Sequence, residues 1–332
     1  MDKAKGKKNQ YKAHLSRVHS RLNAPDNLVK QVVREATGEE IVDKIRIIAG
    51  EINEVYDVTL GNGGNVVVRI SRQKRPDFGQ EEWAIKKCIE AGVPAPEVLL
   101  IKHVQNGEEL LSFSVLRKIT GVTLDTIVDS KGWSSEQVKD YAVQAGEILA
   151  KMHSIKTDGF GDIDDTGKGK YKKYEDIFLK EVNNKEGYMQ LAKDVSLDPK
   201  LIEKALDILA SHRDIYGEVK VPHLTHGDFA PKHIMVNDGK VVGILDFGLV
   251  AGNSPVYDFV RWDFWFGESF PIDSVKEGYT NKDIFNDKSI QKLTSLMMVY
   301  LGLTNIYWYH MTSYDEGVDR IKNKLISELE SF

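Results

Sequence analysis

The most informative part of the sequence is Leu224–Asp263, which reads LTHGDFAPKHIMVNDGKVVGILDFGLVAGNSPVYDFVRWD. Two short apolar runs within residues 233–245 are separated by Asn237-Asp238-Gly239. Asparagine, aspartate and glycine accept the positive φ angles of a tight turn, so this pattern predicts a β-hairpin.

Chemistry-bearing side chains stand before the hairpin and at both of its ends. Asp228 precedes it, His233 opens it and Asp246 follows it. A carboxylate on a loop after a strand can accept the proton of a substrate hydroxyl. The hairpin is expected to bring His233 and Asp246 together, an arrangement that suits Mg²⁺ on nucleotide phosphates, because Mg²⁺ needs only one or two protein carboxylates.

The set His226-Gly227-Asp228, His233 and Asp246 resembles the motifs of the aminoglycoside phosphotransferase family, with some features similar to macrolide and hygromycin phosphotransferases. The resemblance covers roughly residues 44–310. It implies a small-molecule kinase that uses Mg²⁺ and ATP or GTP, with Asp228 as the catalytic residue and Asp246 and His233 at the metal. It also implies structural support of the catalytic loop by His226 and by Asp258.

Upstream residues match the family's nucleotide-binding elements. Arg69 ends a predicted strand, where the resemblance implies a cation on the nucleotide phosphates, and Glu81 would pair with it; Glu82 is the alternative by one position. The resemblance further implies nucleotide contacts from Asn53, in the loop between the first strands, and from Arg117 and Ile119, near the predicted hinge.

Two departures from the family pattern are visible. His233 occupies the place of the metal-binding asparagine, and imidazole is a poorer Mg²⁺ ligand than an amide oxygen. Macrolide phosphotransferases resemble this sequence in having histidine there. Protein kinases have a glycine-rich loop between the first two strands, whereas the corresponding residues 50–55 contain one glycine, Gly50.

The order of predicted elements indicates an α+β chain with a protein-kinase-like, two-lobed fold. Residues 1–30 are expected to form a basic tail or helix, and 31–120 a β-rich nucleotide-binding lobe with a small antiparallel sheet and one helix. Residues 121–332 are expected to form a helical lobe that holds the catalytic loop and the acceptor site. The eleven residues between Asp246 and Asp258 leave no room for a peptide-docking activation segment, which favours a small-molecule acceptor.

Composition and charge narrow the function classes. The chain has 332 residues, 41% of them hydrophobic, and a net charge of −5, with the basic excess confined to residues 1–34. We expect a solvated N-terminus and no nucleic-acid binding. The single cysteine, Cys88, excludes internal disulfides and indicates a cytoplasmic location.

The uncharged run Leu293–Tyr314 is long enough to span a bilayer. It contains seven polar side chains, so it is interpreted as a buried helix and no membrane partner is expected.

Two other interpretations are weighed against the kinase. A non-catalytic nucleotide-binding protein of the same fold would explain His233 and the sparse glycine loop, but has no need for both Asp228 and Asp246. A zinc site formed by His223, His226, Asp228 and His233 is disfavoured, because His223 and His226 are three apart and would face opposite sides of a strand.

Overall fold

The computed structural model describes residues 15–17, 19–48, 53–72, 78–132, 134–267, 270 and 272–332. The chain forms two compact units, which are described separately. Unit 1 comprises residues 1–86 and 95–120, and unit 2 comprises residues 87–94 and 121–332. Helix α3 (Gly79–Glu90) runs from the first unit into the second.

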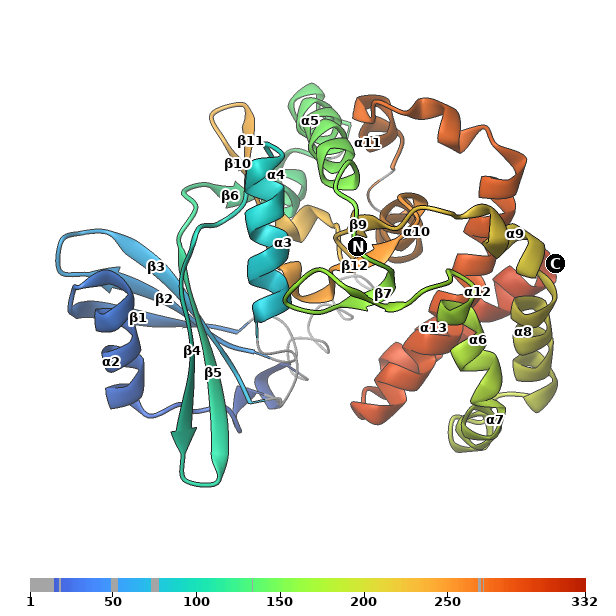
Figure 1. The fold of residues 1–332 in the computed structure, drawn as a ribbon, viewed down its shortest axis with the longest axis horizontal. Coiled ribbons are helices and arrows are strands. Elements are labelled where there is room, and N and C mark those ends of the chain that lie inside the picture. Colours follow the sequence, from blue (N-terminus) through green and yellow to red (C-terminus); the bar gives the residue numbers. More distant parts are fainter. Residues whose placement is uncertain are drawn as a thin grey trace. The chain divides into compact units, whose positions relative to one another are not determined.

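Unit 1 is built on a five-stranded antiparallel sheet with the strand order β1-β2-β3-β5-β4 (Figure 1). The strands are β1 (Ile41–Ile47), β2 (Glu54–Leu60), β3 (Asn65–Ser71), β4 (Val98–Asn106) and β5 (Glu109–Arg117). Alternate residues of β2 are buried, the period expected of a strand with one face on a core. Helix α2 (Asp26–Thr37) packs its valines against that core.

The described residues before α2, which are 15–17 and 19–25, belong to unit 1, which corrects the expectation of a solvated N-terminus for them. Leu15, His19 and Ala24 are buried. The backbone N–H of Ala24 donates to both carboxylate oxygens of Glu54, at 3.0 and 3.1 Å. Arg46 of β1 donates to two carbonyls of the same segment, and these contacts join it to the sheet.

Glu54 is the central anchor of this segment. It is fully buried, accepts a hydrogen bond from the Tyr56 hydroxyl and forms an ion pair with Arg72 at 2.7 Å. Burial alone would raise the pKa of Glu54, but the hydrogen bonds from Tyr56, Ala24 and Arg72 outweigh it and lower the pKa. Glu54 is therefore a buried anion that needs all of these donors.

We predict that Glu54→Gln lowers the free energy of unfolding by roughly 3 kcal/mol, because Arg72 loses a buried partner. Urea denaturation monitored by circular dichroism measures the change. Glu97→Gln is the matched control, since Glu97 pairs with Arg117 on the surface, where an ion pair contributes about 1 kcal/mol or less. Equal effects of the two substitutions would contradict the anchoring role of Glu54.

Unit 2 is mostly helical. Its helices are α4 (Leu124–Lys131), α5 (Glu136–His153), α6 (Asp176–Asn183), α7 (Lys185–Asp194), α8 (Pro199–Ser211), α9 (Arg213–Glu218), α10 (Val256–Phe266), α11 (Asp273–Gly278), α12 (Lys288–Met311) and α13 (Asp315–Glu330). Helices α8 and α9 meet at His212.

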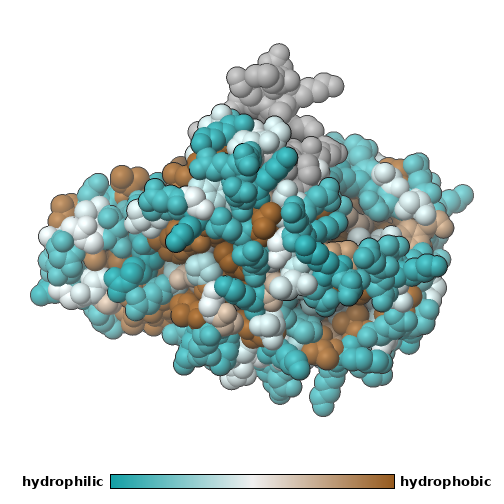
Figure 2. Space-filling model, turned by 90° about the horizontal axis from the view of Figure 1, so that it is seen from above, coloured by the Kyte–Doolittle hydropathy of each residue, from teal (hydrophilic) through white to brown (hydrophobic). Residues whose placement is uncertain are grey.

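The long uncharged run forms α12, a core helix as predicted. Its leucines, Met297, Met298 and Val299 are buried against α10 and α13, the latter lying alongside it (Figure 1). Among the described residues, no helix is long and apolar enough to cross a membrane. The face of the molecule in Figure 2 is mainly hydrophilic, with hydrophobic residues in small separate groups.

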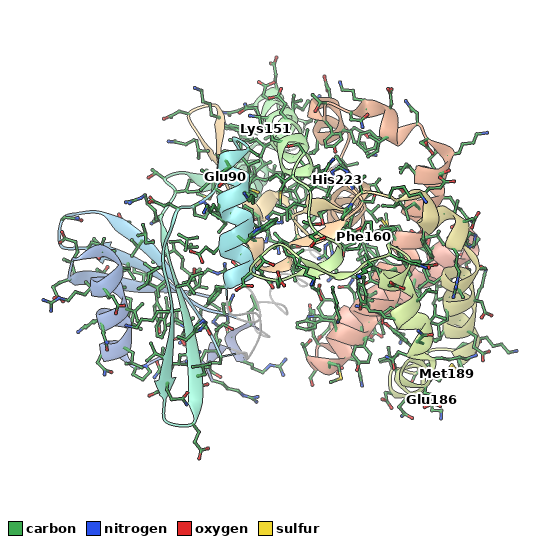
Figure 3. The ribbon with its side chains drawn as sticks, in the orientation of Figure 1. Glu90, Lys151, Phe160, Glu186, Met189 and His223 are labelled. Atoms are coloured by element: carbon green, nitrogen blue, oxygen red, sulfur yellow. The ribbon has the colours of Figure 1, made fainter. Side chains whose placement is uncertain are left out.

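Short strands in unit 2 carry the loops of interest. One sheet has the order β8-β7-β12-β9 and the other β11-β10-β6. Their bounds are β6 (Val122–Thr123), β7 (Phe160–Ile163), β8 (Gly169–Tyr171), β9 (His223–Thr225), β10 (Ile234–Asn237), β11 (Lys240–Ile244) and β12 (Ala251–Asn253). Figure 3 labels Phe160 on β7 and His223 on β9.

The predicted hairpin is present as β10 and β11. Asp238 and Gly239 at its turn both have positive φ, 46° and 79°, as a tight two-residue turn requires. His233 lies just before β10, in the short 3₁₀ turn Pro231–His233, rather than in the strand.

Candidate active site

The loop His226-Gly227-Asp228 follows directly from β9, and its shape depends on glycine. Gly227 has a φ of 78°, and a Cβ atom there would lie 2.0 Å from the carbonyl oxygen of Leu249. No other residue fits without moving the backbone after Asp246. The sequence His-Gly-Asp therefore fixes how Asp228 leaves the strand.

Asp258 of α10 fixes this loop through hydrogen bonds to its backbone. Its side chain is fully buried, and its two oxygens accept the backbone N–H groups of His226 and Gly227, each at 2.8 Å. His153, at the end of α5, donates from Nε2 to the same carboxylate at 2.9 Å. Burial alone would raise the pKa of Asp258, but the hydrogen bond and charge of His153 lower it, so the buried group stays ionised.

His226 joins the loop to the end of the hairpin. Its Nδ1 accepts the backbone N–H of Asp228 at 3.2 Å, and its Nε2 donates to the carbonyl of Leu245 at 2.9 Å. This pair of partners requires the neutral ring with its proton on Nε2. Burial lowers the pKa of His226, which agrees with a neutral ring at pH 7.

The carboxylate of Asp228 is surrounded by positively charged or hydrogen-bond-donating side chains. Its Oδ2 lies 3.0 Å from His233 Nε2 and 3.0 Å from Lys232 Nζ. Its Oδ1 lies 3.5 Å from Arg261 Nη2. Burial raises the pKa of Asp228, but the hydrogen bond from His233 and the charges of Lys232 and Arg261 hold it well below its usual range. Asp228 is thus an anion whose side chain remains 20% exposed.

Asp246 stands where β11 ends, in a left-handed backbone conformation with a φ of 63°. Its side chain is 44% exposed, and its Oδ2 lies 3.8 Å from His233 Nε2. One ligand atom from each of Asp228, His233 and Asp246 lies within 4.8 Å of the other two. The prediction that the hairpin brings His233 and Asp246 together therefore agrees with the structure.

In unit 1, Arg69 and Glu81 form an ion pair between β3 and α3. Both side chains are buried, and the Arg69 guanidinium also lies over the ring of Phe78, 5.3 Å from its centre. Glu82, the alternative partner, is exposed. The helix position that faces the strand is thus Glu81.

The other predicted nucleotide residues are not gathered into a cluster by any contact among the described residues. Arg117 pairs with Glu97 on the surface at 2.7 Å, and its backbone N–H donates to the carbonyl of Glu97. Asn53 and Ile119 are partly buried in unit 1. Gly50 lies outside the described residues.

Three residues around Asp228 and Asp258 were not singled out from the sequence as site residues. Lys232 follows Asp228 by four residues, and Arg261 follows Asp258 by three, one turn along α10. His153 reaches Asp258 across 105 residues of sequence. A helical-wheel reading from Asp258 would have identified Arg261, whereas no local signal points to His153.

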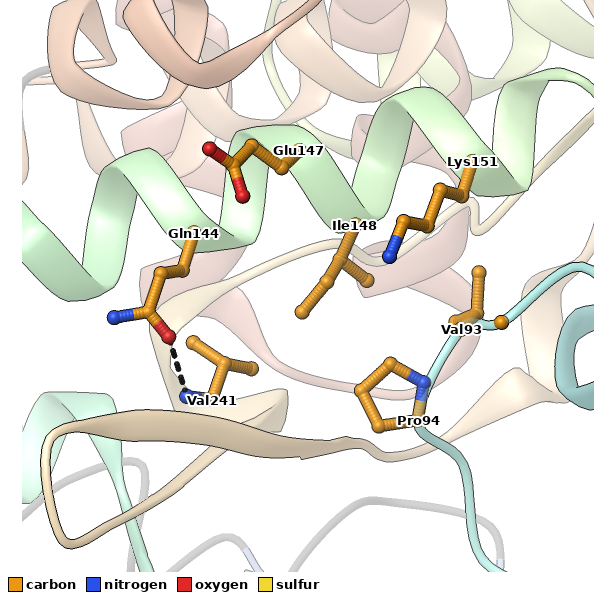
Figure 4. Close-up of a pocket in the computed structure, with 8 residues that line it drawn as sticks. Val93, Pro94, Gln144, Glu147, Ile148, Lys151 and Val241 are labelled. Atoms are coloured by element: carbon orange, nitrogen blue, oxygen red, sulfur yellow. Dashed lines mark hydrogen bonds between the residues drawn. The ribbon is translucent and has the colours of Figure 1, made fainter.

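Unit 2 also has an open pocket of about 490 Å³ between the Gly92-Val93-Pro94 turn, α5 and β11 (Figure 4). Gln144 is engaged there, because its Oε1 accepts the backbone N–H of Val241 at 2.9 Å. Glu147 and Lys151 are the charged lining groups. None of the residues around Asp228 lines this pocket, so it is separate from the candidate active site.

Comparisons with known proteins identify the family and the fold. Hygromycin-B 4-O-kinase from Escherichia coli is 22% identical over 227 residues, 68% of this chain and 63% of that protein. The match therefore spans a little less than two thirds of the relative's length.

Solved structures share the fold. A thermostable mutant of aminoglycoside phosphotransferase APH(4)-Ia, in a ternary complex with AMP-PNP and hygromycin B, has a TM-score of 0.73 at 20% identity, over 91% of this chain and 98% of that chain. The GDP complex of aminoglycoside 2'-phosphotransferase-IIIa has a TM-score of 0.65 at 15% identity, over 93% and 99%.

The fold is thus that of aminoglycoside phosphotransferases, and the predicted α+β, protein-kinase-like fold is confirmed. The chain belongs to the phosphotransferase enzyme family, which it matches over residues 44–280. The resemblance noted from His226-Gly227-Asp228 is confirmed by this match.

We predict that Asp258→Asn lowers the free energy of unfolding by roughly 3 kcal/mol at pH 7, because one amide cannot accept all three donors. The pKa of Asp258 is lower in the folded state than in the unfolded state, where it is about 4. The stability that the ionised side chain contributes is therefore present above about pH 4 and is lost as the pH falls through the folded-state pKa. The difference between wild type and variant should therefore shrink below about pH 4.

Urea denaturation at a series of pH values measures this, with Asp140→Asn as an exposed aspartate control. A difference that is small at pH 7, or that does not change with pH, would contradict the structural role of Asp258.

Proposed function

We propose that this protein is a nucleotide-dependent O-phosphotransferase, which transfers the γ-phosphoryl group of ATP or GTP to a hydroxyl of a small molecule. The observation that carries the proposal is the ionised, partly exposed carboxylate of Asp228 on a loop that Asp258 fixes. A second carboxylate, Asp246, lies beside it.

Asp228 orients the acceptor hydroxyl and receives its proton. The acceptor oxygen forms a bond to the γ-phosphorus, and the bond from that phosphorus to the β–γ bridging oxygen breaks, leaving the nucleoside diphosphate. The lowered pKa of Asp228 makes it a weak base. This suits phosphoryl transfer, in which positioning and charge neutralisation matter more than strong proton abstraction.

The residues present fit a divalent cation. Asp246 and His233 would hold Mg²⁺, with the remaining positions filled by water and nucleotide oxygens, because Mg²⁺ accepts few protein ligands. When bound, the ion would neutralise charge on the nucleotide phosphates. The imidazole of His233 already donates to Asp228, so Asp246 is the principal ligand in this proposal.

Unit 1 is proposed to bind the nucleotide. Arg69 would contact the phosphates, since its planar guanidinium can serve Glu81 and a phosphate oxygen with different N–H groups. Asn53, Arg117 and Ile119 remain predicted nucleotide contacts, with the backbone of residues near Ile119 at the purine.

The acceptor is proposed to be a small molecule, and an aminoglycoside such as hygromycin B is the first to test. Only the 3₁₀ turn Phe247–Leu249 and β12 stand between Asp246 and α10, so this stretch has no long segment that could dock a peptide. Macrolides, other antibiotics and sugars are the next acceptors to screen. We also propose a cytoplasmic location, consistent with the single buried cysteine, Cys88.

We predict that Asp228→Asn lowers kcat by about 10²- to 10⁴-fold with little change in nucleotide affinity, because the proton acceptor is lost while unit 1 is untouched. A coupled assay for ADP or GDP release, run over the acceptor panel with both nucleotides, measures kcat. Titration calorimetry with the nucleotide measures affinity.

Asp207→Asn, an exposed aspartate on α8, is the control and should behave as wild type. If wild type binds nucleotide but transfers no phosphoryl group to any acceptor in the panel, a non-catalytic nucleotide-binding protein is the better interpretation.

We further predict that Asp246→Asn raises the Mg²⁺ concentration for half-maximal activity by about tenfold or more, since the carboxylate charge on the ion is removed. Activity as a function of MgCl₂ at fixed nucleotide is the measurement. His233→Asn should leave that concentration unchanged or lower it, because an amide oxygen suits Mg²⁺ better than imidazole. An unaltered Mg²⁺ dependence in Asp246→Asn would disprove this assignment.

A further inference from the structure

Arg261 approaches Asp228 from a different direction than the catalytic loop does. It lies on α10 one turn after Asp258, so both side chains leave the helix on the same face. Asp258 holds the backbone of the loop, while Arg261 reaches the side chain of Asp228 itself. One helix face therefore fixes the loop and places a guanidinium at its carboxylate.

The two oxygens of Asp228 have different surroundings. Oδ2 has two donors at 3.0 Å, from Lys232 and His233. Among the described residues, Oδ1 has only the 3.5 Å contact with Arg261 Nη2, which is at the outer limit of a hydrogen bond. Oδ1 is therefore the oxygen with capacity for an acceptor hydroxyl, and a hydroxyl bound there would be next to Arg261.

The guanidinium of Arg261 is held in place but not saturated. The Arg261 side chain is only 13% exposed, and its guanidinium carbon, Cζ, lies 5.9 Å from the centre of the Tyr257 ring. Its Nε is buried and has no hydrogen-bond partner among the described residues. The Tyr257 side chain also hydrogen-bonds this guanidinium and fixes its orientation. The long contact with Asp228, at 3.5 Å, leaves Nη2 able to donate to a further oxygen ligand with little rearrangement.

We propose that Arg261 is a catalytic residue that hydrogen-bonds the phosphoryl group while it is transferred to the hydroxyl on Asp228. This inference rests on the proposed function. As the acceptor oxygen bonds to phosphorus and the bond to the bridging oxygen breaks, negative charge is spread over the non-bridging oxygens of the phosphoryl group. Arg261 donates to one of them and remains chemically unchanged.

Lys232 is less suited to this role. Its side chain is 48% exposed, and its ammonium is a point charge on a flexible stem beside Oδ2, the oxygen that His233 already engages. Arg261 presents a planar set of donors that is fixed before the reaction, and fixed donors stabilise developing charge most effectively.

The test compares Arg261→Lys with wild type, using Mg²⁺ with ATP, ADP, and ADP plus aluminium fluoride as a mimic of the phosphoryl group in transfer. The slow hydrolysis of ATP by water serves as the reaction, so no acceptor need be known. We expect kcat to fall by about 10²- to 10³-fold. The KM for ATP and the Kd for ADP should stay within about threefold, because ground-state contacts are kept. The affinity gained by adding aluminium fluoride to ADP should fall by a factor similar to that of kcat.

Arg320→Lys is the matched control, since Arg320 of α13 lies over the Trp265 ring and hydrogen-bonds Tyr309 rather than Asp228, so this variant should behave as wild type. In Arg261→Ala, added guanidinium ion should restore part of the lost activity.

An unchanged kcat in Arg261→Lys would overturn the inference. A loss of kcat that is matched by an equal weakening of ADP binding would also overturn it. So would the failure of both Arg261→Lys and Arg261→Gln to fold, because each of these outcomes assigns Arg261 a structural role. Wild-type protein that neither binds ADP nor hydrolyses ATP would instead contradict the proposed function itself.

Discussion

The buried carboxylate of Asp258 is the constraint on which the candidate active site depends. A charge inside a helical core is unfavourable unless it is fully hydrogen-bonded. Asp258 satisfies this condition with two consecutive backbone N–H groups of the loop and with His153. Because the backbone donors belong to His226 and Gly227, the group that keeps the charge stable also fixes the position of Asp228. The same hydrogen bonds therefore stabilise the buried charge of Asp258 and set the geometry of the candidate active site.

The side chains around Asp228 determine the charge of its carboxylate. Lys232, His233 and Arg261 keep its carboxylate ionised in a partly buried setting, so it is ready to accept a hydrogen bond from a hydroxyl. Asp246 projects from the end of the hairpin to the same place. Negative and positive groups thus alternate over a few ångströms, as expected where a phosphoryl group and a cation must be held together.

Features that depend on residues close together in the sequence could be predicted from it. The Asn237-Asp238-Gly239 turn and the convergence of His233 and Asp246 follow from turn chemistry and hairpin spacing. The pairing of Arg69 with Glu81 was implied by the family resemblance, which left Glu82 as the alternative. Contacts between distant segments could not be predicted in this way. The hydrogen bond from Ala24 to Glu54 joins residues 30 apart, so the N-terminal segment looked like a solvated tail. His153 reaches Asp258 only because α5 and α10 pack in a particular orientation.

The central claim is that Asp228, held by Asp258, faces the hydroxyl that receives the phosphoryl group. A crystal structure of the ternary complex with AMP-PNP, Mg²⁺ and an acceptor identified in the proposed screen tests it most directly. The account predicts the reacting hydroxyl within hydrogen-bonding distance of Asp228 Oδ1, and an oxygen of Asp246 on the ion. A reacting hydroxyl that faces another side chain, with Asp228 directed away from it, would contradict the account.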